Sequence, residues 1–389
     1  MNIAYILNNT YPNNGDTKAF KHMLQGLMHR GVCPFVIMPD KDGIYHDLEK
    51  QEGVSVAALN YRPATYPQLQ TIKDYLLFIP KIFARIYVNK VAARKLAVYL
   101  KQKQINIVHT NVGVVDIGFF AAQKSRIPHI YHIREYGDKD FNIHYFPCKK
   151  TFLKQLSRPQ SYSICITRDI QTYYRQAGEA ASRVIYDGVI PKKSEMPIVS
   201  PKNYFLYAGR IEPAKGLDLL LKAYSLYLQQ AANPLKLVVA GSYTDTPYAN
   251  EQFNYIMKNG LTDSVSILGN RNDIAYLMAH AKAIIIPSRN EGFGFCMPEA
   301  MQQGCLVIAN NTGGTKEQLD NGLREEGGEI ALRYETVEQL TSLLIEVGEN
   351  PVNHYMPYQE RAFRVINRLY TIENNVEQVF TFYKEILQS

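Results

Sequence analysis

Residues 204–240 read YFLYAGRIEPAKGLDLLLKAYSLYLQQAANPLKLVVA and carry the clearest fold signal in the chain. The stretch begins with the apolar run Phe205–Ala208, continues with helically spaced leucines and tyrosines over Leu217–Gln229, and ends with the run Lys236–Ala240. Short buried strands separated by one helix-length segment are typical of a βαβ unit, in which the two strands run parallel. The stretch therefore predicts a parallel sheet covered by helices.

The same alternation continues on both sides of this unit. Further strands are expected at Ile3–Leu7, Phe35–Met38, Asn106–His109, His129–Ile133, Ser163–Ile166, Arg183–Tyr186, Ser264–Leu268, Ala283–Pro287 and Leu306–Ala309. Residues 191–203 are rich in Pro and Lys, lack a hydrophobic period and are interpreted as a linker. The expected fold is α/β, with two tandem Rossmann-like domains, residues 1–190 and 204–365, facing a central cleft. Residues 366–389 are expected to form a C-terminal helix that crosses back to the first domain.

Length and composition agree with two globular domains. The chain has 389 residues and a mass of 44.4 kDa, with 46% hydrophobic and 20% charged residues. These values exclude a disordered or collagen-like chain, and no apolar run approaches the roughly 20 residues of a membrane-spanning helix. The five cysteines form an odd, scattered set without a CxxC pair, which favours reduced thiols over disulfides or structural zinc. Without a leader-like pattern at its start, the sequence predicts a cytoplasmic protein.

The net charge of +7 is unevenly spread. Tyr75–Val115 contains no Asp or Glu but carries seven cations: Lys81, Arg85, Lys90, Arg94, Lys95, Lys101 and Lys103. The segment also has an apolar face at helical spacing, which includes Ile79, Phe83 and Ile86 and is interrupted near Pro80. Two interpretations are open. The apolar face packs on the domain's own sheet, or the segment makes a peripheral contact with an anionic membrane, at its inner face.

Charged residues and glycines follow three of the expected strands in the second domain. The loop AGRIEPAKG places Arg210 and Lys215 between a strand and a helix, where two fixed cations suit a diphosphate. The loop SRNEGFGFCMPEA places Glu291 and Glu299 on either side of a turn in which Gly294 lets backbone N–H groups approach a ligand. A third loop, NTGGTKEQL, adds another tight turn. We expect these loops to lie at the carboxyl edge of the sheet, where ligands of such folds bind.

The order and spacing of these loops resemble the retaining glycosyltransferases of family four, which have the two-Rossmann architecture called GT-B. The family pattern has an Arg and a Lys in the first loop of the second domain, followed by two glutamates with seven residues between them. Arg210, Lys215, Glu291 and Glu299 match it here. The resemblance is close over residues 204–319. It implies transfer of a sugar from a nucleotide diphosphate sugar, with retention of configuration at the anomeric carbon.

The resemblance implies that the leaving diphosphate is stabilised without a metal. Arg210 and Lys215 are expected to face its β-phosphate. The backbone N–H groups of Gly294, Phe295 and Cys296 are expected to donate hydrogen bonds to the same oxygens, where negative charge develops in the transition state. The implied donor is a nucleotide sugar, and no cofactor is expected.

The resemblance also assigns the other parts of the donor. Glu299 is expected to hold the ribose hydroxyls and Glu291 the hydroxyls of the transferred sugar. Asn270 and Arg271 match the loop that meets the base. In the first domain, His132 follows a strand and is expected to face the cleft and approach the donor sugar; a histidine that only caps the strand end is the alternative.

The loop after the first strand departs from the family pattern. Family members often carry a Gly-Gly turn there, whereas this chain has YPNNGDTKAF, in which Gly15 is the one glycine. Gly15 is still assigned to the donor side. The expected acceptor is a glycan or a lipid-linked glycan, bound mainly by the first domain, and no nucleic-acid partner is expected.

Several alternatives stand beside these assignments. Arg134 and Glu135 are open to interpretation as a structural ion pair. Asp138 and Asp140 match the metal-binding DxD motif of the other glycosyltransferase architecture, but that motif belongs to a single-domain fold. A nucleotide-sugar epimerase shares the GT-B architecture but lacks the glutamate pair in this form, and a pseudo-glycosyltransferase would bind without turnover. A nicotinamide dehydrogenase is disfavoured because no G-x-G-x-x-G follows the first strand.

Overall fold

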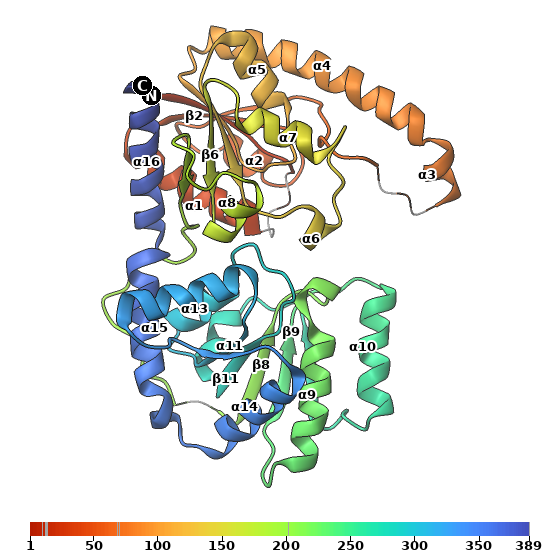
Figure 1. Ribbon diagram of the computed structural model, residues 1–389, viewed down its shortest axis with the longest axis vertical. Helices are drawn as coiled ribbons and strands as arrows, with labels where there is room; N and C mark the ends of the chain where they lie inside the picture. Colours follow the sequence, from red (N-terminus) through yellow and green to blue (C-terminus); the bar gives the residue numbers. More distant parts are fainter. Residues whose placement is uncertain (10, 12–14, 68, 70, 201, 389) are drawn as a thin grey trace. The chain divides into compact units, whose positions relative to one another are not determined.

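The computed structural model describes residues 1–389 except residues 10, 12–14, 68, 70, 201 and 389 (Figure 1). The chain divides into two compact units, each with its own sheet. The N-terminal unit comprises residues 1–188 and 372–389, and the C-terminal unit comprises residues 189–371. The last helix of the chain therefore belongs to the N-terminal unit.

The N-terminal unit is built on a parallel seven-stranded sheet in the order β3-β2-β1-β4-β5-β6-β7. Its strands are β1 (Asn2–Ile6), β2 (Cys33–Met38), β3 (Ser55–Ala58), β4 (Ile107–Thr110), β5 (His129–Ile133), β6 (Ser161–Cys165) and β7 (Ser182–Val184). Its helices are α1 (Gly15–His29), α2 (Tyr45–Glu49), α3 (Ile72–Leu76), α4 (Phe78–Gln102), α5 (Ile117–Ser125), α6 (Asp138–Phe141), α7 (Lys149–Leu156), α8 (Arg168–Tyr173) and α16 (Ile372–Gln388). The central strands β1, β4 and β5 are buried almost throughout, as expected of parallel strands covered on both faces.

Helix α16 packs against α1 in the N-terminal unit. A Cβ atom on Gly26 of α1 would lie 2.3 Å from a methyl carbon of Val376, so the missing side chain permits this close approach. Val379 and Tyr383 continue the same buried face of α16 into the core of the unit. The contact joins the C-terminal end of the chain to the sheet that contains β1.

The C-terminal unit is built on a parallel six-stranded sheet in the order β10-β9-β8-β11-β12-β13. Its strands are β8 (Tyr204–Ala208), β9 (Lys236–Ala240), β10 (Val265–Gly269), β11 (Ala283–Ile286), β12 (Val307–Asn310) and β13 (Leu332–Tyr334). Its helices are α9 (Leu217–Gln230), α10 (Pro247–Lys258), α11 (Ile274–His280), α12 (Cys296–Gln302), α13 (Gly313–Glu326), α14 (Val337–Glu349) and α15 (Met356–Leu369), with 3₁₀ turns η1 (Pro213–Lys215) and η2 (Val352–Tyr355). The predicted α/β fold with two Rossmann-like domains is confirmed.

The two units end at different residues from the predicted domains. Residues 366–389, expected as one helix, contain the last turn of α15 in the C-terminal unit and all of α16 in the N-terminal unit. The described residues of 191–203, expected as a linker, contain no helix or strand, but they are bonded to the C-terminal unit. Gln302 Nε2 donates to Pro191 O at 2.5 Å, and Lys193 N donates to Asn367 Oδ1 at 2.8 Å.

Candidate active site

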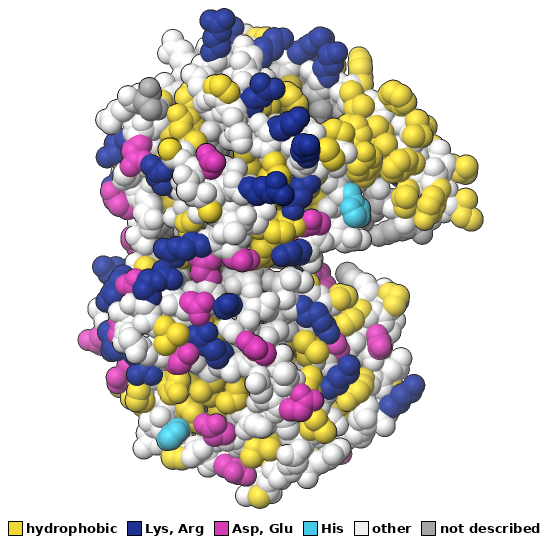
Figure 2. All heavy atoms as spheres, viewed as in Figure 1, with side chains coloured by type: hydrophobic (Ala, Val, Ile, Leu, Met, Phe, Trp, Pro, Cys, Tyr) yellow, Lys and Arg dark blue, Asp and Glu magenta, His cyan; other side chains and the backbone are white. Residues whose placement is uncertain are grey.

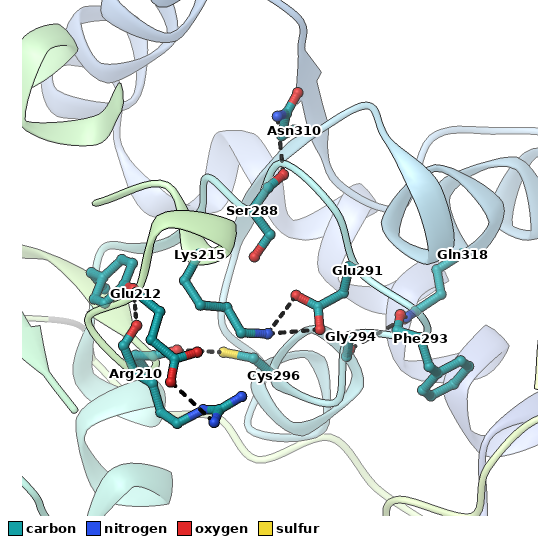
Figure 3. Close-up of polar contacts among 12 residues, drawn as sticks. Arg210, Glu212, Lys215, Ser288, Glu291, Phe293, Gly294, Cys296, Asn310 and Gln318 are labelled. Carbon is teal, nitrogen blue, oxygen red and sulfur yellow. Dashed lines mark hydrogen bonds and ion pairs between the residues drawn. The ribbon is translucent and has the colours of Figure 1, made fainter. Parts of the chain in front are cut away.

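Three loops of the C-terminal unit meet at the carboxyl edge of its sheet (Figure 3). They follow β8, β11 and β12, which are neighbours in the sheet. Arg289 N donates to Ala214 O at 2.9 Å, which joins the first loop to the second, and Gly314 N donates to Glu291 O at 2.7 Å, which joins the second to the third. The side chains on these loops are therefore held on a bonded framework.

Lys215 and Glu291 form an ion pair at the centre of this framework (Figure 3). Lys215 Nζ donates to both carboxylate oxygens of Glu291, at 2.8 Å each. The side chains are 25% and 14% exposed, so solvent screens the pair less than an ordinary surface pair. Both residues were predicted for the site; their direct contact was not predicted.

Arg210 lies at the start of the same loop as Lys215. Its guanidinium is 3.1 Å from the carboxylate of Glu212, and its side chain is 49% exposed. The hydroxyl of Tyr207 donates to Arg210 O at 2.8 Å and fixes the backbone there. An ion pair this exposed contributes little stability, so exchanging Glu212 for a more highly charged ligand costs little.

The turn before α12 presents backbone donors beside these side chains. Gly294 has a φ of +91°, and a Cβ atom there would lie 2.9 Å from Glu291 Cγ, so glycine is required. The buried side chain of Gln318 donates to two carbonyl oxygens of the turn, at 2.5 and 3.3 Å. Phe295 precedes α12 and Cys296 begins it. Because the first N–H groups of a helix have no intrahelical acceptor, they can donate hydrogen bonds to a ligand at this end.

Cys296 contributes a hydrogen bond rather than a nucleophile. Its thiol donates to Ala208 O at 3.4 Å. Desolvation raises the pKa of the thiol well above its ordinary 9.0, and the nearby carboxylates of Glu299 and Glu291 raise that pKa further. The residue therefore stays protonated and links α12 to the end of β8.

Arg289 is a structural residue of the site that sequence reasoning missed. Its guanidinium donates to both carboxylate oxygens of Asp218, at 2.8 and 2.5 Å, and to Pro213 O at 2.7 Å. Asp218 lies in the first turn of α9, so the pair joins the loop after β11 to the helix after β8. The signal was an Arg two residues before Glu291, but its partner is 71 residues away along the chain.

The remaining predicted donor contacts lie on elements around this framework. Glu299 is half-buried in the first turn of α12. Asn270 and Arg271 follow β10, the outermost strand on that side of the sheet, and both are exposed. Arg271 is paired with Asp273, with contacts of 2.8 and 2.6 Å. The structure thus brings Arg210, Lys215, Glu291 and the turn at Gly294 together, and leaves the predicted base loop exposed.

His132 lies in β5 of the N-terminal unit, and its side chain is fully buried. Its Nδ1 is 3.1 Å from His109 Nε2, and His109 Nδ1 is 2.6 Å from the hydroxyl of Tyr383 on α16. No described residue forms a hydrogen bond with His132 Nε2, and Asp187 Oδ1 is 3.9 Å from it. Burial lowers the pKa of His132 well below its ordinary 6.5, and Arg134 and His109 lower that pKa further, so the ring is neutral.

Arg134 pairs with Asp187, not with Glu135 as the structural alternative expected. The guanidinium forms a buried ion pair with Asp187 and donates to Asn111 Oδ1 at 3.2 Å. Burial raises the pKa of Asp187, although Arg134 lowers it. Burial and the neighbouring carboxylates raise the pKa of Glu135 to about 8. The buried partners His109, Asn111 and Asp187 were not predicted as a cluster.

The first loop and the Asp138-Lys139-Asp140 triplet belong to the N-terminal unit. Gly15 begins α1 and is exposed, while Asn13 and Asn14 lie outside the described residues. Asp138 is bonded to Lys149 at 3.4 Å and to the hydroxyl of Tyr173, and Asp140 accepts a hydrogen bond from Tyr136 N at 2.9 Å.

The described residues contain neither a metal-binding cluster nor a membrane-spanning helix. Within the part of the chain that the structure describes, no three His, Cys, Asp or Glu side chains are grouped as a metal ion would need. In the same part, no helix combines the length and the apolar character needed to cross a bilayer.

The chain is similar to known proteins over part of its sequence and over nearly its whole length in fold. Residues 191–364 match the family profile described as glycosyl transferases group 1. The uncharacterised glycosyltransferase MJ1178 of Methanocaldococcus jannaschii is 25% identical over 64% of this chain and 70% of its own length. The lipopolysaccharide core biosynthesis mannosyltransferase LpcC of Rhizobium leguminosarum is 28% identical, over 46% of this chain and half of its own length.

Solved glycosyltransferase structures share the fold of this chain. HepE of Anabaena, crystallised in complex with UDP, superposes with a TM-score of 0.76 at 18% identity, over 99% of this chain and 100% of its own. WaaG, a glycosyltransferase involved in lipopolysaccharide biosynthesis, superposes with a TM-score of 0.67 at 14% identity, over 97% of this chain and 98% of its own. Residues 191–364 are thus similar to the group 1 glycosyl transferases, and the fold of the chain is GT-B.

Proposed function

We propose that this protein is a retaining glycosyltransferase that moves a sugar from a nucleotide diphosphate sugar to a glycan or lipid-linked acceptor in cell-surface polysaccharide or glycolipid synthesis. The observation that carries the proposal is the Lys215–Glu291 pair, which stands beside Arg210 and the glycine turn at one edge of a parallel sheet. HepE, with the same fold, has been crystallised with UDP and with UDP-glucose, and LpcC is a lipopolysaccharide core mannosyltransferase.

Two cations and the backbone donors suit a diphosphate leaving group. As the bond from the anomeric carbon to the β-phosphate oxygen breaks, negative charge collects on the diphosphate. Arg210, Lys215 and the N–H groups from Gly294 to Cys296 stabilise that charge in place of a metal ion. The exposed Arg210–Glu212 pair opens at little cost, so Arg210 turns toward the phosphates when the donor binds.

Glu291 acts as a positioning residue in this proposal. Both of its carboxylate oxygens accept hydrogen bonds from Lys215, which holds the ammonium group and leaves the carboxylate poorly placed to attack carbon. The bond from the acceptor oxygen to the anomeric carbon forms on the face that the diphosphate leaves. The acceptor proton passes to the departing phosphate oxygen, so no protein nucleophile is needed.

The other predicted contacts complete the donor site in this proposal. Glu299 holds the ribose, and Asn270 and Arg271 lie beside the base. His132 approaches the sugar through Nε2, the ring nitrogen with no partner among the described residues. Gly15, at the start of α1 in the N-terminal unit, is assigned to the donor side.

A ligand screen followed by product analysis tests the proposal. UDP, GDP and ADP are added in turn to the purified chain, and the thermal midpoint is measured. The cognate diphosphate should stabilise the protein by about 2.7 kcal/mol at about 100 times its Kd. The matching sugar donor is then supplied with candidate acceptors, and NMR of the product should show retained anomeric configuration. Inversion would contradict the mechanism, and conversion of the donor without any acceptor would favour the epimerase alternative.

A further inference from the structure

An exposed apolar strip lies on α3 and the first half of α4 (Figure 2). We define the strip as Leu69, Ile72, Tyr75, Leu76, Leu77, Ile79, Phe83, Ile86 and Tyr87. These nine side chains are among the 20 large hydrophobic side chains that are exposed in the described part of the chain. Scattered exposed apolar residues are ordinary, but a contiguous group of this kind marks an interaction surface.

The strip is exposed because α4 has buried residues only from Arg85 onward. The buried residues of α4 are Arg85, Asn89, Ala92, Ala93, Leu96, Ala97 and Leu100, and α3 has none. Ile72, Leu76 and Phe83 are 82%, 76% and 68% exposed. Of the two interpretations that the sequence left open, packing on the domain's own sheet is thus ruled out for most of this apolar face.

Specific contacts hold the strip-bearing helices in place. Asn89 accepts a hydrogen bond from Arg62 N at 2.9 Å and donates to Arg62 O at 2.8 Å. The guanidinium of Arg85 lies 3.9 Å from the centre of the Phe146 ring. Thr71 caps α3 in a capping box with Asp74. The strip is therefore carried on a fixed helical scaffold rather than on a loop.

The charged residues along α3 and α4 are almost all positive. No acidic residue lies between Tyr75 and Val115, and the two acids that flank this range are bonded within the unit. Asp74 pairs with Lys81 at 2.7 Å, and Asp116 accepts a hydrogen bond from Asn89 at 3.1 Å. The exposed cations of the two helices are Lys73, Lys90, Arg94, Lys95 and Lys101.

We propose that α3 and the first half of α4 insert into the interface of an anionic lipid bilayer, with the strip among the acyl chains and the cations at the headgroups. A basic helix with an apolar face is the pattern expected at such a surface. Self-association is less favourable, because a twofold contact would bring the same cations of two copies together. The proposal goes beyond the proposed reaction and needs no substrate, so the two can fail separately.

The chain contains no tryptophan, so one introduced tryptophan reports on its own position. Phe83→Trp places the reporter in the strip, and Met257→Trp on α10, 60% exposed in the native chain, is the matched control. We expect the emission of F83W to shift to shorter wavelength on phosphatidylcholine–phosphatidylglycerol vesicles, while that of M257W stays unchanged. Equal behaviour of the two variants would overturn the proposal. A shift of F83W that depends on protein concentration and not on vesicles would also overturn it, in favour of self-association.

Flotation of the unmodified chain separates charge from insertion. Recovery with the anionic vesicles is expected at about 0.1 M salt and should be reduced, but not abolished, at about 1 M salt, where surface charges are screened. Phe83→Asp should reduce the bound fraction at least tenfold, whereas Ile198→Asp, at a position that is 90% exposed outside the strip, should not. Complete loss at high salt, or unchanged binding of F83D, would overturn insertion. No recovery at low salt would overturn the proposal entirely.

Discussion

The two units share one winding order but place their charged residues differently at the carboxyl edge of the sheet. In each sheet, the first strand of that unit along the chain is third in the order, and the fourth strand of the unit lies beside it. In the C-terminal unit, Arg210, Lys215 and Glu291 lie on loops beyond the strands and are partly exposed. In the N-terminal unit, His132 and Arg134 lie in or directly after β5 and are buried.

This difference indicates that the two edges have different roles: exposed loop residues can bind a ligand, whereas buried residues hold a fixed geometry. A side chain on a loop can exchange a protein partner for a ligand, as the exposed Arg210–Glu212 pair allows. A buried charge such as Arg134 cannot give up Asp187 without a large desolvation cost. The C-terminal edge is therefore suited to holding a charged donor, and the N-terminal edge to holding its own side chains in a fixed geometry.

The largest effect is expected at the cations of the C-terminal unit. Lys215→Ala and Arg210→Ala should each lower turnover about 100-fold or more, because each removes one preorganised stabiliser of the leaving diphosphate. Turnover is measured with the donor identified by the ligand screen. Lys222→Ala, an exposed lysine on α9, is the control and should keep its activity. Near-normal rates in both site variants would contradict the leaving-group assignment.

The buried edge of the N-terminal unit should be sensitive to acid. His132 is neutral in the folded chain, so its folded pKa lies below its unfolded pKa. As the pH falls below about 6.5, the unfolded chain binds the proton first. Each such histidine then lowers the free energy of unfolding by about 1.4 kcal/mol per pH unit, until the folded pKa is reached. The stability supplied by the neutral ring is present above about pH 6.5 and is lost on acidification.

Urea unfolding of a variant isolates this one group. Between about pH 7 and about pH 5, the wild type should lose about 2 kcal/mol more than His132→Gln, which cannot be protonated. His144→Gln, at an exposed position in the same unit, should lose as much as the wild type. If H132Q and wild type lose equal amounts, His132 is not held neutral by burial.

Within the C-terminal unit, the two glutamates should separate. Glu299→Ala should weaken binding of the nucleoside diphosphate about tenfold or more, the scale for losing hydrogen bonds to a charged group. Glu291→Ala should leave the diphosphate affinity nearly unchanged, because Glu291 is assigned to the transferred sugar and not to the diphosphate. It should weaken mainly the binding of the intact sugar donor. Calorimetry with each ligand measures both effects. Equal losses for both ligands in both variants would remove the division of roles.

The sequence predicted every interior strand of the two sheets and missed two of their four edge strands. Central strands such as β5 and β9 match their predicted runs residue for residue. The strands β3 and β13 were missed, and each is the outermost strand of its sheet, with few buried positions. An outermost strand has one neighbour and covers less core, so its residues carry a weaker apolar pattern.

The site was predictable where one loop carries the pattern and not where distant residues complete it. Lys215, Glu291 and Gly294 were found because a known motif contains them. The Arg289–Asp218 pair and the His109–Tyr383 contact were missed, since their partners lie 71 and 274 residues apart and no local pattern marks them. The contact of His132 with His109 was not predicted for the same reason, because it depends on packing between two strands that no local spacing encodes.

The smallest effect is expected at the acidic triplet of the N-terminal unit. Asp138 is paired with Lys149 and bonded to Tyr173, and both charged side chains are partly exposed, at 30% for Lys149 and 40% for Asp138. A pair of this kind contributes about 0–1 kcal/mol to stability, so Asp138→Asn should leave the fold intact. It should change turnover by no more than about threefold. Turnover should likewise survive EDTA, because the cations and backbone donors of the C-terminal unit meet the diphosphate. Transfer that stops in EDTA, returns with manganese or magnesium, and is lost in D138N would move the charge-stabilising group from the C-terminal unit to the N-terminal unit and reverse the division between binding and positioning.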